Sequence, residues 1–173
     1  MAAVVFMRGV NVGGHKAFRP SVVAGRLSSL DVVSIGAAGT FVVHADADET
    51  TIRSRFLKQI PFETQLMICP AGDIASLVAK DPFSERSLPR SDGQFVSVVD
   101  RLPRALPKLP LHVPEGVDWQ VGVIAVHRCF VATLRRNVGR TPIYPNEVIE
   151  RRLGVAATTR NWATILKVHR ALC

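Results

Sequence analysis

The spacing of apolar residues predicts a regular alternation of strands and helices in the first half of the chain. Short apolar runs are typical of buried strands, and apolar residues that recur every three or four positions are typical of amphipathic helices. In order, the pattern predicts a strand at 3–7, a helix from Pro20 through Leu30, strands at 32–35 and 41–43, a helix at 49–60, a strand at 65–69 and a helix near Asp73, its expected N-cap.

The second half repeats this order with one difference. Prolines at 103, 107, 110 and 114 remove backbone donors and clash with a preceding helical turn, so this stretch is expected to hold short helical turns at most. The remaining pattern predicts a strand at 95–99, a hairpin of strands at 119–126 and 129–134 with His127 and Arg128 at its turn, a helix from Pro145 closed by Gly154, an extended stretch at 157–160 and a final helix with Asn161 as N-cap.

Together these elements predict an α+β protein made of two successive ferredoxin-like halves. Each half has the order strand, helix, strand, strand, helix, strand, with helices packed on an antiparallel or mixed sheet. We place the N-terminal half at 1–84, a connection at 85–93 and the C-terminal half at 94–173, because the connection shows no periodicity. No convincing residue-level repeat relates the halves, so the duplication is one of topology.

Composition limits the class of protein. With 173 residues and 47% hydrophobic content, the chain can bury a substantial core. No apolar run approaches the roughly 18 to 20 residues that cross a bilayer, and residues 1–20 lack a signal-peptide pattern, so we expect a cytoplasmic protein without membrane contact. The three cysteines are widely spaced and predict neither a disulfide framework nor a metal site. No cofactor is predicted.

The charge adds a bias toward anionic partners. The formal net charge is +8 at pH 7, which favours nucleic acid, phosphorylated metabolites and acidic proteins. The arginines are scattered along the chain, as an arginine-rich proteome also produces. The charge alone therefore indicates no specific partner.

One loop suggests a site for an anion. The first strand runs into Arg8-Gly9-Val10-Asn11-Val12-Gly13-Gly14-His15-Lys16, which has glycines that let backbone N–H groups approach a ligand and cations at both ends. A tight structural turn would need the same glycines, so both interpretations stay open. The loop is not a P-loop, because Lys16 comes one position late and Ala17 replaces the hydroxyl that would hold Mg²⁺. Its glycines also lack the Rossmann spacing.

Four segments, in this order, resemble the bacterial domain of unknown function 1697 family. They are Arg8-Gly9-Val10-Asn11-Val12-Gly13-Gly14 after an apolar strand, Gly39 before the third strand, Val138-Gly139-Arg140 after the hairpin, and the stretch from Thr159 to Lys167. The resemblance spans nearly the whole chain. It implies an α+β fold of two ferredoxin-like halves and supplies no reaction.

Three segments depart from the usual sequence of that family. Ala38-Gly39-Thr40 stands where the family usually has Ser-Gly-Asn, Thr141-Pro142 stands where it has a Ser-Lys pair, and Trp162-Ala163-Thr164 stands where it has Trp-Asn-Thr. If the family's site uses the missing side chains as donors, this chain carries an altered version of it.

Cationic and amide side chains at strand ends, loops and helix starts form the predicted ligand site. Arginine can bind phosphate or carboxylate through two N–H groups, and Asn161 would place such an anion near a helix N-terminus. The candidate ligand-binding residues are Arg8, Asn11, Gly13, Gly14, Lys16, Gly39, Thr40, Arg140, Arg160, Asn161, Trp162 and Lys167. No catalytic residue is assigned, because the five histidines show no metal-ligand spacing and no Gly-x-Ser-x-Gly motif occurs.

Three functions compete on this evidence. The leading one is a cytoplasmic protein, whether or not an enzyme, that binds a small phosphorylated or nucleotide-like anion where the glycine-rich loop meets the Arg160-Asn161-Trp162 segment. The second is a nucleic-acid-binding module, which the positive charge favours but the 6% aromatic content does not. The third is an interaction protein whose loops are purely structural.

Overall fold

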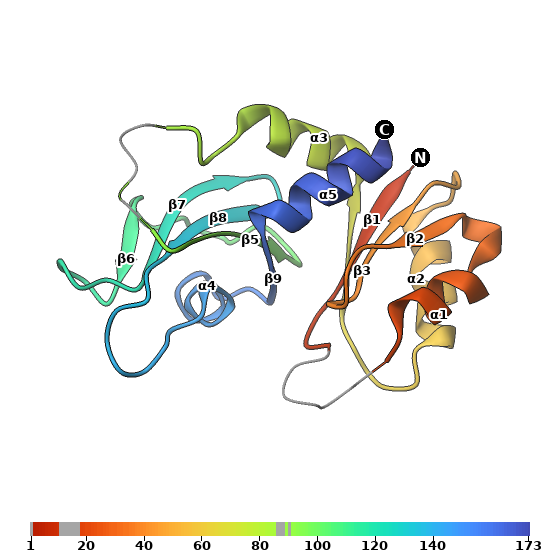
Figure 1. The fold of residues 1–173 in the computed structure, drawn as a ribbon, viewed down its shortest axis with the longest axis horizontal. Coiled ribbons are helices and arrows are strands. Elements are labelled where there is room, and N and C mark those ends of the chain that lie inside the picture. Colours follow the sequence, from red (N-terminus) through yellow and green to blue (C-terminus); the bar gives the residue numbers. More distant parts are fainter. Residues whose placement is uncertain (1, 11–17, 86–88, 90) are drawn as a thin grey trace. The chain divides into compact units, whose positions relative to one another are not determined.

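The structure is a computed structural model that describes residues 2–10, 18–85, 89 and 91–173. The chain divides into two compact units, one formed by Met1–Ser76 with Leu166–Cys173 and the other by Leu77–Ile165. Each unit contains one antiparallel sheet (Figure 1). The domain limits expected around 85–93 stay a prediction.

The first unit contains a complete βαββαβ arrangement. Its elements are β1 (Ala3–Met7), α1 (Pro20–Arg26), a 3-10 turn (Ser28–Leu30), β2 (Val32–Ser34), β3 (Thr40–Val43), α2 (Glu49–Gln59) and β4 (Leu66–Pro70). The strands lie in the order β2-β3-β1-β4, and each neighbouring pair is antiparallel. This is the split βαβ order expected of a ferredoxin-like half.

Helices α1 and α2 pack on one face of this sheet. That face carries alternate residues of β1 and β3, which pack with buried side chains of the two helices. The residues involved include Ala3, Val5, Met7, Phe41 and Val43 from the strands and Val23, Ala24, Leu27, Ile52 and Phe56 from the helices and their ends. Val4 and Phe6, on the opposite face of β1, are also fully buried, which explains why the strand is apolar throughout.

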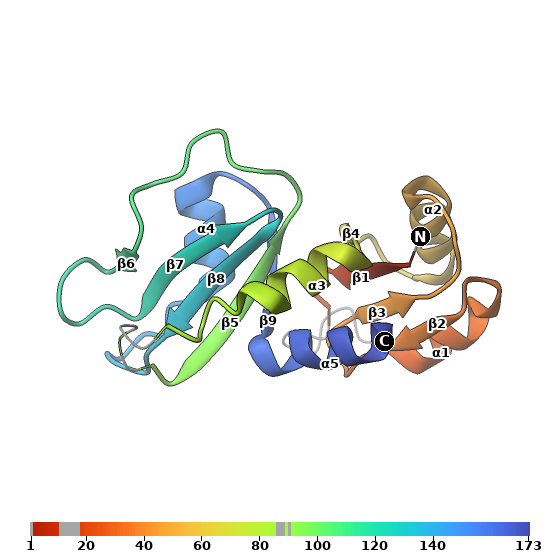
Figure 2. The ribbon, with the colours of Figure 1, turned by 90° about the horizontal axis from the view of Figure 1, so that it is seen from above.

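The second sheet has the same strand order with one strand added. The elements that follow β4 are α3 (Ala71–Lys80), β5 (Gly93–Val99), β6 (Leu111–Val113), β7 (Val121–His127), β8 (Phe130–Arg135), α4 (Pro145–Leu153), β9 (Ala157–Asn161) and α5 (Trp162–Leu172). Figure 2 shows the order β6-β7-β8-β5-β9. Without β6, this order matches β2-β3-β1-β4 strand for strand, so the predicted α+β fold of two ferredoxin-like halves is confirmed.

The halves differ in the crossover after their first strand. Residues 100–120, all of them described, contain no helix, as the prolines predict. They contain instead the short edge strand β6, which was not predicted because a run of three residues between prolines gives little periodic signal. Leu109, Leu111 and Val113 pack against the core that α4 forms on one face of this sheet.

Two predicted boundaries were wrong. Helix α3 begins at Ala71 directly after β4, so Asp73 lies in its first turn and is not the N-cap. Strand β7 extends through His127, which pairs with Phe130, and the hairpin turn is therefore formed by Arg128 and Cys129. In contrast, Gly154 closes α4 in the left-handed conformation as predicted, with a φ of 65°.

Candidate functional site

The predicted site residues fall into three groups. Asn11, Gly13, Gly14 and Lys16 lie outside the described residues. Arg8, Gly39, Thr40 and Lys167 belong to the first unit, and Arg140, Arg160, Asn161 and Trp162 belong to the second. The meeting of the glycine-rich loop with the Arg160–Trp162 segment therefore stays a prediction, and each unit is considered by itself.

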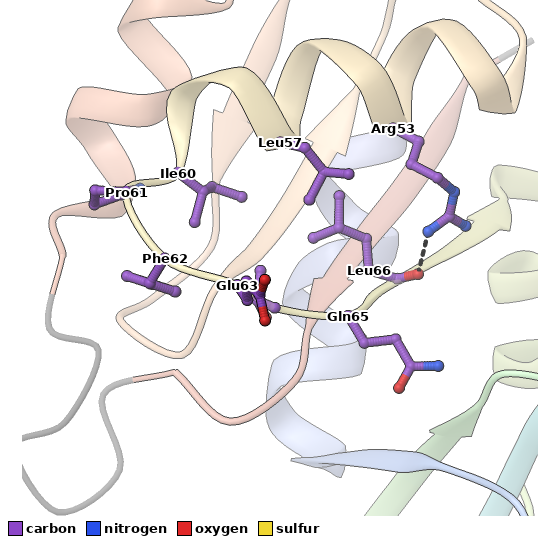
Figure 3. A pocket seen from close by; sticks show the side chains of 9 residues that line it. Arg53, Leu57, Ile60, Pro61, Phe62, Glu63, Gln65 and Leu66 are labelled. Carbon is purple, nitrogen blue, oxygen red and sulfur yellow. Dashed lines mark hydrogen bonds between the residues drawn. The ribbon is translucent and has the colours of Figure 1, made fainter.

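In the first unit, Arg8 is held by its backbone next to a hollow. Its N–H donates to the carbonyl of Gln65 (3.0 Å), and its carbonyl accepts from the Thr64 hydroxyl (2.9 Å). Thr64 and Gln65 also line a hollow of about 930 Å³ at the C-terminal end of α2 (Figure 3). Arg53 on its wall donates to the Leu66 carbonyl (2.9 Å) and pairs with Glu49 (2.6 Å). The Arg53 charge is therefore already compensated.

Gly39 has a packing reason to be glycine. Its φ is +69°, and an added Cβ would lie 2.8 Å from the Cβ of Met7. Its carbonyl accepts the Met7 N–H at 2.8 Å. Thr40 is fully buried and pairs with Phe6 of β1. Close approach of β1 and β3 explains the sequence here without a ligand.

In the second unit, the register brings two predicted segments to one end of the sheet. Strand β5 begins at this end, and its neighbours β8 and β9 both finish there. Phe95 pairs with Thr133 on one side and with Asn161 on the other. Thr133 and Asn161 therefore lie about 10 Å apart, two strand spacings, and β8 continues for two more residues before its loop begins. We call this region, with Arg135, Arg136, Arg140 and Arg160, the basic end.

A buried glutamine fixes the loop that carries Arg140. The Gln120 side chain, in a residue only 9% exposed, donates to the Thr141 carbonyl (3.0 Å) and accepts from the Ile143 N–H (2.9 Å). Gly139, at a φ of +81°, approaches the same amide so closely that a Cβ would lie 3.0 Å from Gln120 Nε2. Arg140 is therefore held between two residues that contact the same buried side chain.

Arg140 itself is available to a ligand. The residue is exposed and makes no hydrogen bond or ion pair with the described part of the chain. Asp92 is a carboxylate at this end, and it accepts the Asn137 N–H at 2.7 Å. Asp92 and Arg136 also line a hollow of about 400 Å³.

Lys167, elsewhere on α5, is likewise exposed without a partner among the described residues.

Two further arginines of the basic end lie against aromatic rings. The Arg136 guanidinium is 4.7 Å from the Trp119 ring, which stacks on His112 at 4.7 Å between ring centres. The Arg135 guanidinium is 5.0 Å from the centre of the Tyr144 ring. These distances fall within the range of cation–π attraction. The rings thus orient two positive charges without neutralising them.

Two buried polar atoms at this end have no hydrogen-bond partner. They are His112 Nε2 and Arg135 Nε, and they are the buried side-chain atoms without a partner within the described residues. His112 pairs with Gly122 on β7, one position from the start of that strand. A buried polar atom without a partner costs free energy, so these two atoms are less favourably placed than an ordinary apolar core atom.

The Arg160–Trp162 segment is largely used by the fold. Arg160 is 7% exposed and donates to the Thr158 hydroxyl (2.9 Å) and the Thr159 carbonyl (2.8 Å), and burial lowers its pKa to about 10. Asn161 is the predicted N-cap of α5, since its oxygen accepts from the N–H (2.8 Å) and hydroxyl (2.7 Å) of Thr164. The Trp162 ring packs edge-on against Phe83 at 5.2 Å.

Metal-ligand clusters and membrane-spanning helices are both absent from the described part of the chain. Among the described residues, no three histidine, cysteine or acidic side chains come close enough to hold a metal ion. The described helices include none with the length and apolar character needed to cross a bilayer.

Comparison with known proteins supports the fold. No protein-family model matches the chain, and no curated protein matches its sequence. The fold is similar to that of the conserved bacterial protein SP0830 from Streptococcus pneumoniae, with a TM-score of 0.59 and 13% sequence identity over 99% of this chain and 98% of that one. At this identity the similarity concerns the fold alone.

Proposed function

We propose that this protein binds a small anionic ligand, phosphorylated or nucleotide-like, at the basic end of its second unit. The observation that carries the proposal is that Gly139 and Thr141, on either side of Arg140, both lie against the buried Gln120 amide, while the Arg140 charge has no partner among the described residues. A cation whose backbone is already ordered loses less conformational entropy on binding than one on a free loop.

The surrounding groups favour an anion in this place. The Arg135 and Arg136 guanidinium groups lie against aromatic rings, and neither forms an ion pair with a carboxylate among the described residues. The guanidinium group matches the oxygens of a phosphate or carboxylate through parallel N–H donors. After a small shift of the Arg135 side chain, its Nε–H, which has no partner among the described residues, would be able to donate a hydrogen bond to a ligand.

A small ligand suits this region better than a nucleic-acid strand. Strand binding without sequence preference uses several exposed aromatic rings along a basic groove. Tyr144, 45% exposed, is the single aromatic residue among the large exposed apolar side chains of the described chain. Trp119 is 5% exposed and cannot offer a face to successive bases.

Binding to the Arg140→Ala variant tests the proposal. Isothermal titration would compare the original chain with this variant, using inorganic phosphate, pyrophosphate and nucleoside monophosphates as probes. Loss of a hydrogen bond to a charged group costs about 1.5–3 kcal/mol, so we expect roughly tenfold or greater weakening. Arg104→Ala is the matched control, because Arg104 is exposed and without a partner among the described residues.

Two results would contradict the proposal. One is that none of these anions binds the original chain. The other is that Arg104→Ala weakens binding as much as Arg140→Ala, which would indicate non-specific attraction by the net charge. Strongly salt-dependent binding that requires long oligonucleotides would favour the nucleic-acid function instead.

We also propose that the chain belongs to the domain of unknown function 1697 family and works in the cytoplasm. The four sequence segments that resemble this family support the first statement. Cell fractionation with an antibody against the protein tests the location.

A further inference from the structure

Neither helix capping nor burial explains the presence of Tyr144 at its position in the fold. It occupies the N-cap of α4, where serine, threonine, aspartate and asparagine are favoured, and its side chain makes no capping hydrogen bond. It is the chain's one tyrosine, and 45% of it is exposed, so it is not a core residue either. Neither capping nor burial accounts for an aromatic ring at this place.

The ring is nevertheless held in a defined position. The Tyr144 carbonyl accepts the Val148 N–H at 3.2 Å in the first turn of α4, which fixes the backbone. The Arg135 guanidinium lies 5.0 Å from the ring centre, so it covers part of the ring while much of the residue stays exposed. Arg135 is itself the last residue of β8 and is anchored by the sheet.

The Tyr144 ring and the Arg140 cation lie on one short loop that is hydrogen-bonded to the Gln120 side chain. Arg140 and Tyr144 are four positions apart in sequence, so even a fully extended chain would separate their Cα atoms by only about 14 Å. Between them, Thr141 and Ile143 both bond to the Gln120 side chain. A single small molecule can therefore reach both residues.

We infer that the ligand of the basic end is a nucleoside phosphate, whose base stacks on Tyr144 and whose phosphate is bound by Arg140. This inference rests on the proposed function and names its ligand class. Stacking on an aromatic ring is available to every base, because each base has a π face. A phosphorylated sugar without a base would use the cation but leave the ring in water.

Titration with matched ligands tests the inference. AMP and ribose 5-phosphate carry the same phosphate and ribose and differ in the base, so their affinities isolate its contribution. We expect AMP to bind roughly fivefold or more tightly than ribose 5-phosphate, as stacking on an aromatic side chain predicts. In the Tyr144→Leu variant this preference should disappear, while ribose 5-phosphate should bind as before. Tyr144→Phe keeps the ring and should keep the preference.

The outcomes separate this inference from the proposed function. If both ligands bind equally and Tyr144→Leu changes neither affinity, the base is not recognised here and the inference is wrong, while anion binding stands. If Tyr144→Phe loses the preference as fully as Tyr144→Leu, the hydroxyl and not stacking is responsible, and the inference is again wrong. If neither ligand binds, the proposed function and the inference both fail. Circular dichroism of each variant checks that the fold is kept.

Discussion

The first crossover of the two halves shows how one strand order is kept by two different packing solutions. Between β1 and β2, helix α1 and the turn after it bury Val23, Leu27 and Leu30. Between β5 and β7, an extended proline-rich segment buries Leu109 partly and leaves Leu102 63% and Leu106 54% exposed. The order of the four paired antiparallel strands is common to both halves, and so is the second helix, which is α2 in one half and α4 in the other. These elements, not the first helix, maintain the topology.

The largest expected loss of stability comes from shortening a buried side chain in the connection between β1 and β2. Leu27→Ala removes a side chain that is 3% exposed and should lower the free energy of unfolding by about 2–5 kcal/mol. Leu106→Ala is the matched change in the other half and should cost less than about 0.5 kcal/mol, because its side chain lies in solvent. Urea unfolding monitored by circular dichroism measures both. Equal losses of unfolding free energy in the two variants would contradict the conclusion that the first crossover is buried in one half and largely exposed in the other.

A glycine in each half gives the next largest effect. Gly39→Ala should destabilise by about 1–2 kcal/mol or more, because a Cβ meets the Cβ of Met7 at 2.8 Å and φ is +69°. In Gly139→Ala the Cβ meets the end of the Gln120 side chain at 3.0 Å, which can move. We therefore expect Gly139→Ala to lose less stability than Gly39→Ala. It should also bind anions more weakly, because it disturbs the contacts of Gln120 with the loop that carries Arg140. Thermal melts and phosphate titrations separate the two effects.

The smallest predicted effect concerns the starts of α2 and α4. Asp48 caps α2 by accepting from the Thr51 N–H (2.8 Å) and hydroxyl (2.9 Å), and the first of these bonds chiefly lowers the pKa of Asp48 below its ordinary value. This stabilisation is present above the unfolded pKa and is lost as pH falls through the lower folded value.

Asp48→Ala should therefore lower the melting temperature at pH 7 and lose most of this effect in strongly acidic solution. Tyr144→Phe, at the corresponding position of α4, should change the melting temperature at neither pH, because Tyr144 makes no capping bond. A pH-independent loss in Asp48→Ala would show that the cap does not act through its carboxylate.

The sequence was most informative where one residue acts on its own neighbours. Pro145, Gly154 and Asn161 mark helix limits through local backbone chemistry, and their positions were predicted correctly. The positions of the buried strands along the chain were also predicted from apolar runs, because a strand with two buried faces must be apolar throughout.

The sequence was least informative where distant residues cooperate. The Gln120 side chain bonds to Thr141 and Ile143, more than 20 positions away, and nothing in the sequence around Gln120 indicates these hydrogen bonds. The pairing of Arg135 with Tyr144 depends likewise on where α4 begins relative to β8. Two adjacent arginines followed by a glycine loop were the available signal, and the rings beside them could not be assigned from spacing.

The most direct test of the account is to locate the anion on the protein. A titration of the isotopically labelled chain with pyrophosphate, followed by amide chemical shifts, reports which backbone groups respond. We expect saturable shifts concentrated at Asn137–Tyr144, abolished by Arg140→Ala and kept in Arg104→Ala. Shifts spread evenly over exposed arginines, or confined to the hollow at the end of α2, would contradict it.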